Sequence, residues 1–183
     1  NESIPWTEEL IERYEDKWNW GSPRNRRDDS LSGNEAIPWS DALIERYEHK
    51  WDWRTLSSNE SLPWSEALIQ RYEDEWTWNS QSGLSDSLNE NCSLPWSELL
   101  IERFEHRWDW RLLSRNVSLS WSETLIDQFD DKWNWISLSE NVSLPWSEAL
   151  IERYEDKWFW SSLSRNESIP WTEELIERYE DKW

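Results

Sequence analysis

The sequence is short of several residue types: it has no methionine, one cysteine, two histidines and three glycines in 183 residues. The single cysteine, Cys92, excludes an internal disulfide framework, and so few glycines leave no Gly-rich phosphate-binding loop. No run approaches the roughly 20 apolar residues that span a bilayer, so we expect no membrane insertion. Because methionine is absent, we expect that residue 1 is not a translation start and that the chain is processed or part of something longer.

Basic residues are also few: the chain has 19 Lys and Arg residues and 39 Asp and Glu residues, which gives a net charge of −20. Such a surface repels phosphate backbones and anionic headgroups, so we expect no nucleic-acid partner. Cations and basic proteins are better suited to it. Acidity of this degree is typical of disorder when aromatic residues are few. Here 15% of the residues are aromatic and they recur at fixed places, which indicates packing.

Tryptophan is in excess, with 20 copies that form three columns in a tandem repeat. The first Trp of each unit is Trp6, Trp39, Trp64, Trp96, Trp121, Trp146 or Trp171. A W-x-W motif then supplies a second column, made of Trp18, Trp51, Trp76, Trp108, Trp133, Trp158 and Trp183. It also supplies a third column, made of Trp20, Trp53, Trp78, Trp110, Trp135 and Trp160. The basic period is 25 residues, and a period of this size is typical of solenoids and repeat arrays.

The period divides the chain into repeats 1 to 7, of which the last is incomplete. Their approximate bounds are residues 1–33, 34–58, 59–90, 91–115, 116–140, 141–165 and 166–183. Repeats 1 and 3 are longer because each carries a loop insertion between W-x-W and the next Leu, at about residues 21–30 and 79–87. We expect residues 1–183 to form a single array.

Residues 1–18 are identical to residues 166–183, and Trp6 lies 165 residues before Trp171. We interpret the chain as a window of a longer array of 165-residue super-repeats, with a recent duplication of the terminal unit as the alternative. In either case the two identical segments are expected to adopt the same conformation.

Each repeat predicts two helices, as repeat 3 illustrates. Ser65 is a candidate N-cap, and the stretch 65–75 has helical periodicity. Its apolar stripe consists of Leu68, Ile69, Tyr72 and Trp76. A second, shorter helix is predicted to begin inside W-x-W, where the middle residue is of a cap-forming type in five of six repeats: Asn19, Asp52, Thr77, Asp109 and Asn134, against Phe159. The Asn that follows this helix (Asn59, Asn116, Asn141, Asn166) is predicted to be a left-handed terminator.

Two short helices in 25 residues make a hairpin too small to be stable alone, so stacking on neighbouring repeats has to complete the core. This reasoning predicts an all-α fold, an α-solenoid of short helical hairpins. The alternative is a leucine-rich-repeat-like α/β solenoid, because L-S-x-N-x-S-L-P resembles part of such a repeat and W-x-W would then be a short strand. The helical periodicity of residues 65–75 favours the all-α fold.

The strings L-P-W-S-E-x-L-I and W-x-W-x-x-L-S-x-N, at residues 144–151 and 158–166, resemble known Trp-rich repeats. They look like tandem repeats of uncharacterised bacterial proteins and, more loosely, like short W-x-x-L-S-x-N repeats of giant viruses. The resemblance covers nearly the whole chain. It implies a repeat scaffold and carries no catalytic or ligand-binding residues.

Few residues offer chemistry. His49 and His106 occupy a position that the other five repeats fill with Asp, which indicates a solvated helix face. Cys92 stands where other repeats have Glu or Val, in a tolerant turn. Rows of carboxylates, for example Glu12 and Glu15, indicate a solubilising face, with weak Ca²⁺ binding between stacked units as the alternative. We predict no catalytic or cofactor-binding residue, no dedicated metal site and no enzyme.

The leading functional hypothesis is a structural protein that forms an extended or fibrous assembly and self-associates end to end. The alternative is a solenoid whose concave or Trp-lined face binds a basic protein or a glycan. The three Trp columns are predicted to be core, with the third column, beside the insertions, as the one that could face the surface. The sequence does not fix the compartment, and our expectation leans towards a secreted or surface protein.

Overall fold

The structure, a computed structural model, describes residues 4–21, 30–79 and 87–182. Within these ranges the regular elements are all helical and no strand occurs. The predicted all-α class is therefore confirmed for the described residues, and the W-x-W strand of the alternative fold is wrong. Most of both insertions, predicted at about 21–30 and 79–87, lies outside the described residues, as does Trp183.

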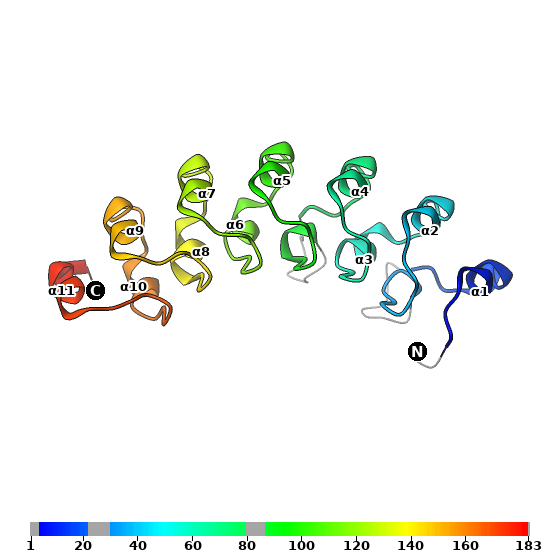
Figure 1. The fold of residues 1–183 in the computed structure, drawn as a ribbon, viewed down its shortest axis with the longest axis horizontal. Helices are drawn as coiled ribbons and strands as arrows, with labels where there is room; N and C mark the ends of the chain where they lie inside the picture. The colour runs from blue at the N-terminus through cyan, green and yellow to red at the C-terminus, as the bar shows by residue number, and fades with distance from the viewer. Residues whose placement is uncertain (1–3, 22–29, 80–86, 183) are drawn as a thin grey trace. The chain divides into compact units, whose positions relative to one another are not determined.

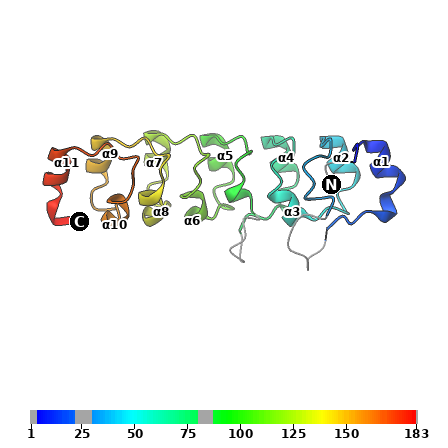
Figure 2. The same ribbon diagram turned by 90° about the horizontal axis from the view of Figure 1, so that it is seen from below.

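The chain divides into two compact units, Asn1–Pro95 and Trp96–Trp183. In the second unit α5, α7 and α9 lie along one edge, and α6, α8 and α10 lie along the other (Figures 1 and 2). In the first unit α2 and α4 likewise lie on one side and α3 on the other. The repeats in which two α-helices are described thus place them in two layers, and the single array across both units stays a prediction.

Each repeat begins with a helix of six residues. These helices are α1 (Glu8–Arg13), α2 (Asp41–Arg46), α4 (Glu66–Arg71), α5 (Glu98–Arg103), α7 (Glu123–Gln128), α9 (Glu148–Arg153) and α11 (Glu173–Arg178). A Ser or Thr hydroxyl caps each N-terminus; in α4, Ser65 Oγ accepts from the Leu68 amide at 3.1 Å. The predicted N-cap is confirmed, because the hydroxyl satisfies an amide that the first turn leaves unpaired.

The helix of repeat 3 is shorter than predicted, since it ends at Arg71 and residues 72–75 form turns. The indole groups explain this early end. Trp76 Nε1 donates to the Ile69 carbonyl at 3.1 Å, an oxygen that a continuing helix would pair with the amide four residues later. The apolar periodicity persists to Trp76 because both Tyr72 and Trp76 still face the core through the turn.

The second helices are α3 (Trp53–Ser57), α6 (Trp110–Leu113), α8 (Trp135–Glu140) and α10 (Trp160–Leu163). The predicted caps are confirmed in α3, α6 and α8, where Asp52, Asp109 and Asn134 accept from helix amides. Shorter 3-10 turns complete the described elements: η1 (Glu15–Lys17), η2 (Leu88–Glu90) and η3 (Glu180–Lys182). In repeat 3, η2 follows the insertion at the place where other repeats end their second helix.

One second helix lacks its cap, because Phe159 precedes α10, makes no side-chain cap hydrogen bond and is 47% exposed. Phe159→Asp is expected to stabilise the protein by about 1 kcal/mol, since a carboxylate here repeats the cap that Asp109 gives α6. Urea unfolding followed by circular dichroism measures the change. Phe159→Ala removes the same ring without adding an acceptor, and equal stability of the two variants would contradict the capping explanation.

The two identical segments adopt the same secondary structure. The bounds of α1 and η1 match those of α11 and η3 residue for residue, and Thr7 and Thr172 cap the two helices in the same way. The expectation of equal conformation is confirmed for the helices of these segments. This agreement shows that the local sequence determines the conformation, because the segments have different neighbours.

The core of a repeat is a small aliphatic cluster drawn from both helices. In repeat 6, Leu150 and Ile151 of α9 and Leu163 of α10 are fully buried. With so few aliphatic residues in each repeat, the aromatic and polar contacts to the neighbouring repeats form much of the buried surface.

Candidate functional site

The most regular feature of the molecule is the junction between consecutive repeats, where aromatic rings interlock. The third Trp of one repeat packs on the Tyr or Phe and on the second Trp of the next repeat. Trp135 lies 4.7 Å from Tyr154 and 4.9 Å from Trp158, measured between ring centroids. The same arrangement occurs for Trp20 with Tyr47 and Trp51, for Trp53 with Tyr72 and Trp76, and for Trp110 with Phe129 and Trp133.

The three Trp columns differ in burial. The second column is the most buried, with 4% or 5% exposure at Trp51, Trp76, Trp108, Trp133 and Trp158. The first column is half-buried except for the buried Trp96, and each of its members in repeats 1 to 6 packs on the second Trp of the same repeat. The third column, the candidate for a surface-facing row, is half-buried or buried. Among the described residues, no Trp is exposed.

Indole N–H groups pair with backbone carbonyls at fixed offsets. The second Trp donates seven residues back in five repeats, as Trp158 Nε1 does to the Ile151 carbonyl at 3.2 Å, whereas the buried Trp133 Nε1 makes no such bond. The first and third Trp donate five residues back, as Trp146 does to Asn141 and Trp135 does to Asp130. The rings therefore cap carbonyls that the short helices leave unpaired, which explains why the fold uses Trp rather than Phe in these columns.

A row of buried serines connects the second helices. Ser139 Oγ donates to the Trp135 carbonyl at 2.7 Å and accepts from the Phe159 amide of the next repeat at 2.9 Å. The same pair of bonds is made by Ser32, Ser57 and Ser114. All of these serines have an exposure of 0%, so each hydroxyl serves as both donor and acceptor inside the junction.

A row of buried asparagines runs beside the serines. Asn141 Nδ2 donates to the Ser114 carbonyl at 3.0 Å and to the Asn116 carbonyl at 3.3 Å, and its Oδ1 accepts from the Ser143 amide at 2.9 Å. Asn59, Asn91 and Asn166 make the corresponding bonds, each donating to the carbonyl of a serine near the end of the repeat before the preceding one (Ser32, Ser57 and Ser139) and accepting from an amide of its own turn.

The predicted left-handed terminator is wrong at Asn141, which has φ −77° and ψ 118° and is therefore extended. Asparagine is used here for its amide, which bonds to the preceding repeat, and not for its tolerance of a positive φ. Sequence reasoning missed both polar rows. The available signal was the recurrence of the same Asn at the start of every repeat, and of the same Ser near the end of every complete repeat except repeat 3, which has Asn89 there.

A lysine closes the outer side of most junctions. Lys157 Nζ lies 5.1 Å from the Trp135 ring centroid and 2.5 Å from an Asp130 carboxylate oxygen, both in the preceding repeat. Lys50, Lys132 and Lys182 take the same place over Trp20, Trp110 and Trp160, and each pairs with a Glu of the preceding repeat. The lysine thus contributes both a cation–π contact and an ion pair across the junction.

The junction between repeats 5 and 6 carries the largest shift of a tyrosine pKa. Burial, followed by the hydrogen bond that its hydroxyl donates to Asp127, raises the pKa of Tyr154 well above its usual range. The hydrogen bond from Tyr154 in turn lowers the pKa of Asp127, which also pairs with Arg153 at 3.0 Å. In repeat 3 the equivalent Tyr72 hydroxyl is buried without a hydrogen bond.

Tyr154→Phe is expected to destabilise the protein by about 1.5–3 kcal/mol at neutral pH, because the lost bond is to a charged acceptor. The folded-state pKa of Tyr154 is raised, so its contribution is complete below the unfolded-state value of about 10 and declines as the pH rises above it. Urea unfolding at neutral and alkaline pH measures both effects. Tyr72→Phe is the matched control and should cost little, since no bond is lost; equal losses in the two variants would contradict the assignment.

The residues whose side chains could take part in catalysis or metal binding do not belong to the aromatic, serine or asparagine rows. His49, His106 and Cys92 are exposed. No group of three or more His, Cys, Asp or Glu in the described ranges is placed to hold a metal ion, so the weak Ca²⁺ site stays a prediction without a location. Over the same ranges, no helix combines the length and the apolar character needed to cross a membrane.

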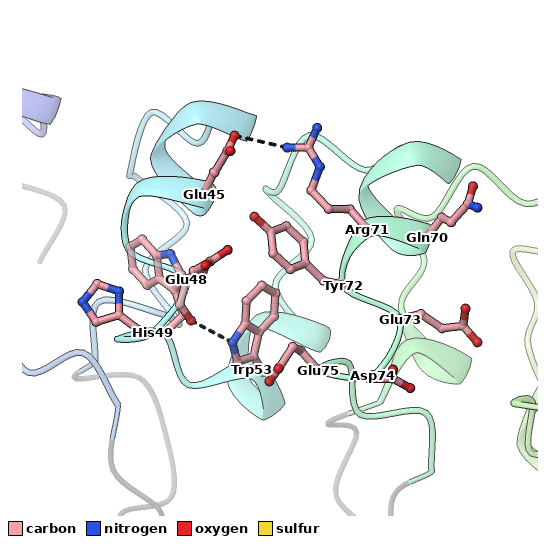
Figure 3. Close-up of a pocket in the computed structure, with 11 residues that line it drawn as sticks. Glu45, Glu48, His49, Trp53, Gln70, Arg71, Tyr72, Glu73, Asp74 and Glu75 are labelled. Carbon is pink, nitrogen blue, oxygen red and sulfur yellow. Dashed lines mark hydrogen bonds and ion pairs between the residues drawn. The ribbon is translucent and has the colours of Figure 1, made fainter.

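An open pocket of about 750 Å³ lies between repeats 2 and 3. Five carboxylates and a single guanidinium line it, together with the aromatic rings of Trp51, Trp53 and Tyr72. Arg71 is paired with Glu45 at 3.3 Å across its rim. Figure 3 shows Glu48 and Tyr72 pointing into the space between the two helices. The pocket is therefore acidic with an aromatic wall.

Comparisons with protein-family models, curated proteins and solved structures find no match. The chain is a helical repeat protein with recurring Trp clusters. That statement rests on the regular helices and on the junction contacts described above.

Proposed function

We propose that this protein is a non-enzymatic scaffold, an α-solenoid whose helical hairpins stack into one extended array. The observation that carries the proposal is the recurrence of the aromatic, serine and asparagine rows within both units. The aromatic and serine rows take atoms from two consecutive repeats, and each asparagine donates to a serine carbonyl near the end of the repeat before the preceding one. Buried groups of one repeat are therefore satisfied by the repeats that precede it. Nearest-neighbour dependence of this kind is typical of solenoids.

Sequence equivalence supports continuation of the stacking from one unit to the next. Before the boundary at Pro95, Trp78 stands in the third column and Asn91 in the asparagine row. After it, Phe104 and Trp108 occupy the positions that pack on a third-column Trp elsewhere. The aromatic residue types are thus the same as at the other junctions, whereas the serine row has Asn89 at this place.

The identical segments support end-to-end self-association. Within the second unit, α11 covers Trp160 through Tyr179, with ring centroids 4.6 Å apart. Residues 1–18 have the same sequence and the same helix, with Tyr14 in the place of Tyr179. In a second copy this segment can take the place of α11 on Trp160 by exchange of identical segments, and Tyr14 is 45% exposed in this chain.

Small-angle scattering tests the solenoid. A compact globule of 183 residues has a radius of gyration of about 16 Å, and an extended array is expected to give a much larger value. A result near the globular value would contradict the solenoid.

Sedimentation over a concentration series, with electron microscopy of the same samples, tests the end-to-end contact. Association is expected to grow with concentration and to weaken in Tyr14→Ser, which alters a side chain that the single chain leaves exposed. Sedimentation as a monomer at every concentration would defeat end-to-end assembly and leave the solenoid standing.

A binding function is the second candidate, and the acidic pocket between repeats 2 and 3 is the observation that favours it. Its charge suits a basic partner. A glycan is a less suitable ligand, because sugars stack on open indole faces. The described Trp rings are buried or half-buried against other rings.

A further inference from the structure

The lysine that closes the junctions is replaced in repeat 3. At the position just before the second Trp, the chain has Lys50, Lys132, Lys157 and Lys182, and each of these ammonium groups lies over a third-column Trp. Repeat 3 has Glu75 at this position. The charge at this one place is therefore inverted, and the junction with repeat 2 receives no ammonium group from the chain.

The inversion leaves the acidic partner of the missing lysine without its cation. Glu48 stands where Glu15, Asp130 and Glu155 pair with the lysine of the following repeat. Glu48 and Glu75 both line the pocket, and no ion pair joins either carboxylate to another described residue.

The aromatic wall of the pocket also lacks a partner found elsewhere. Trp53 packs on Tyr72 and Trp76 at 4.7 Å and 4.9 Å, as its equivalents do. Tyr72 is 8% exposed, and its hydroxyl makes no hydrogen bond. Burial raises the pKa of Tyr72, and the adjacent Arg71 opposes that shift, but the ion pair of the Arg71 guanidinium is with Glu45. In Figure 3 the Tyr72 ring points into the pocket above Trp53.

The two carboxylates, the aromatic ring and the hydroxyl that line the pocket all suit one kind of ligand. A protonated amine can lie against the Trp53 ring, pair with Glu48 and Glu75, and donate to the Tyr72 hydroxyl oxygen. A bare metal ion is not suited, since no described cluster of three or more ligating side chains is placed to hold one. We propose that the pocket between repeats 2 and 3 binds an alkylammonium group, which fills the place that a lysine of the chain occupies at four other junctions.

The pocket is formed by two repeats of one chain, so amine binding does not require end-to-end assembly. A failure of the binding test and a failure of the proposed scaffold function can therefore be told apart. Isothermal titration with 1,5-diaminopentane and with a short end-blocked peptide, whose one lysine is its only charged residue, distinguishes a free amine from a lysine side chain. Both are expected to bind with millimolar affinity and a stoichiometry of one, because the contacts are few and partly exposed. The probe that binds at least tenfold more tightly identifies the source of the group. Pentan-1,5-diol, which has no charge, is expected not to bind.

Glu75→Lys is the decisive variant, since it restores the chain's own ammonium group. It is expected to weaken binding of both amines at least tenfold while leaving the fold intact. Glu60→Lys is the matched control, because it makes the same change of charge at an exposed position outside the pocket. Equal weakening in the two variants would show general attraction to an acidic protein and would overturn the site.

A gain-of-site variant provides the opposite test. Lys157→Glu removes the ammonium group from the junction between repeats 5 and 6 and places a carboxylate beside Asp130 and Trp135. The variant is expected to bind two amines per chain if it retains the circular dichroism of the parent. A wild-type chain that shows no saturable binding at tens of millimolar amine would overturn the proposal outright.

Discussion

Replacing Trp158 by Ala is expected to destabilise the protein by about 3–5 kcal/mol, the range for large truncations in a core. The side chain is 5% exposed and packs on three rings: Trp135 of the preceding repeat, and Trp146 and Tyr154 of its own. Its indole N–H also caps the Ile151 carbonyl. The substitution therefore removes packing within one repeat and across one junction and leaves a buried carbonyl unpaired.

Urea unfolding followed by circular dichroism gives the loss of stability, and hydrogen exchange shows where it occurs. Protection is expected to fall in both repeats 5 and 6, since Trp158 contacts both. Trp146→Ala is the matched control: Trp146 is half-buried and should lose clearly less. His106→Asp, on an exposed face where other repeats carry Asp, should change stability by less than about 0.5 kcal/mol. If all three variants lost the same stability, the aromatic row would not be the source of cohesion.

The helices could be predicted from sequence because their signals are local. Ser65 before an apolar stripe, and Asp52 inside W-x-W, are cap residues whose bonds lie within three residues. The 25-residue period alone assigns every Trp to one of the three columns. Helix length could not be predicted in the same way. Periodicity continued through Tyr72 and Trp76, whereas the carbonyl that ends the helix is taken by an indole seven residues along.

The junctions were harder to predict, because their hydrogen bonds join repeats and are not encoded within one. The Asn141 amide donates to carbonyls 25 and 27 residues earlier. The sequence around Asn141 does not contain these partners, and it therefore predicted a helix terminator. Recurrence of the same Asn in each repeat, and of the same Ser in each complete repeat except repeat 3, was the visible signal. Turn chemistry accounts for the Asn carbonyl oxygen but not for its NH2 group, which bonds to other repeats.

The pocket shows the opposite case, where a departure from the repeat carries the information. In the sequence, Glu75 is one more acidic residue on the acidic face of the helix predicted over residues 65–75. Its significance appears once the structure places Lys157 and its equivalents over a Trp ring of the preceding repeat. Charge inversion at a position that contacts only solvent would have no consequence, whereas at this position it leaves a carboxylate and an aromatic face without their cation.

Replacing Asn141 by Leu is expected to cost about 3 kcal/mol, although the two side chains have similar size. The amide group makes bonds to the Ser114 and Asn116 carbonyls and accepts from the Ser143 amide, and Asn141 is 3% exposed. Leu leaves these groups buried without partners, and each unsatisfied group costs about 1–3 kcal/mol. Val142→Ala, at a 53% exposed neighbour, is the control and should change stability by less than about 0.5 kcal/mol.

Asn141→Asp separates the polar contact from the shape of the side chain. A carboxylate here faces two carbonyl oxygens, so its folded-state pKa is expected to rise above the unfolded value of about 3.9. A protonated Asp can still donate one bond, and the loss of stability relative to wild type should therefore be smaller at about pH 5 than at about pH 8. Urea unfolding of both proteins at the two pH values measures the difference. A loss that does not depend on pH, or a Leu variant as stable as wild type, would mean that the asparagine row does not hold the repeats together.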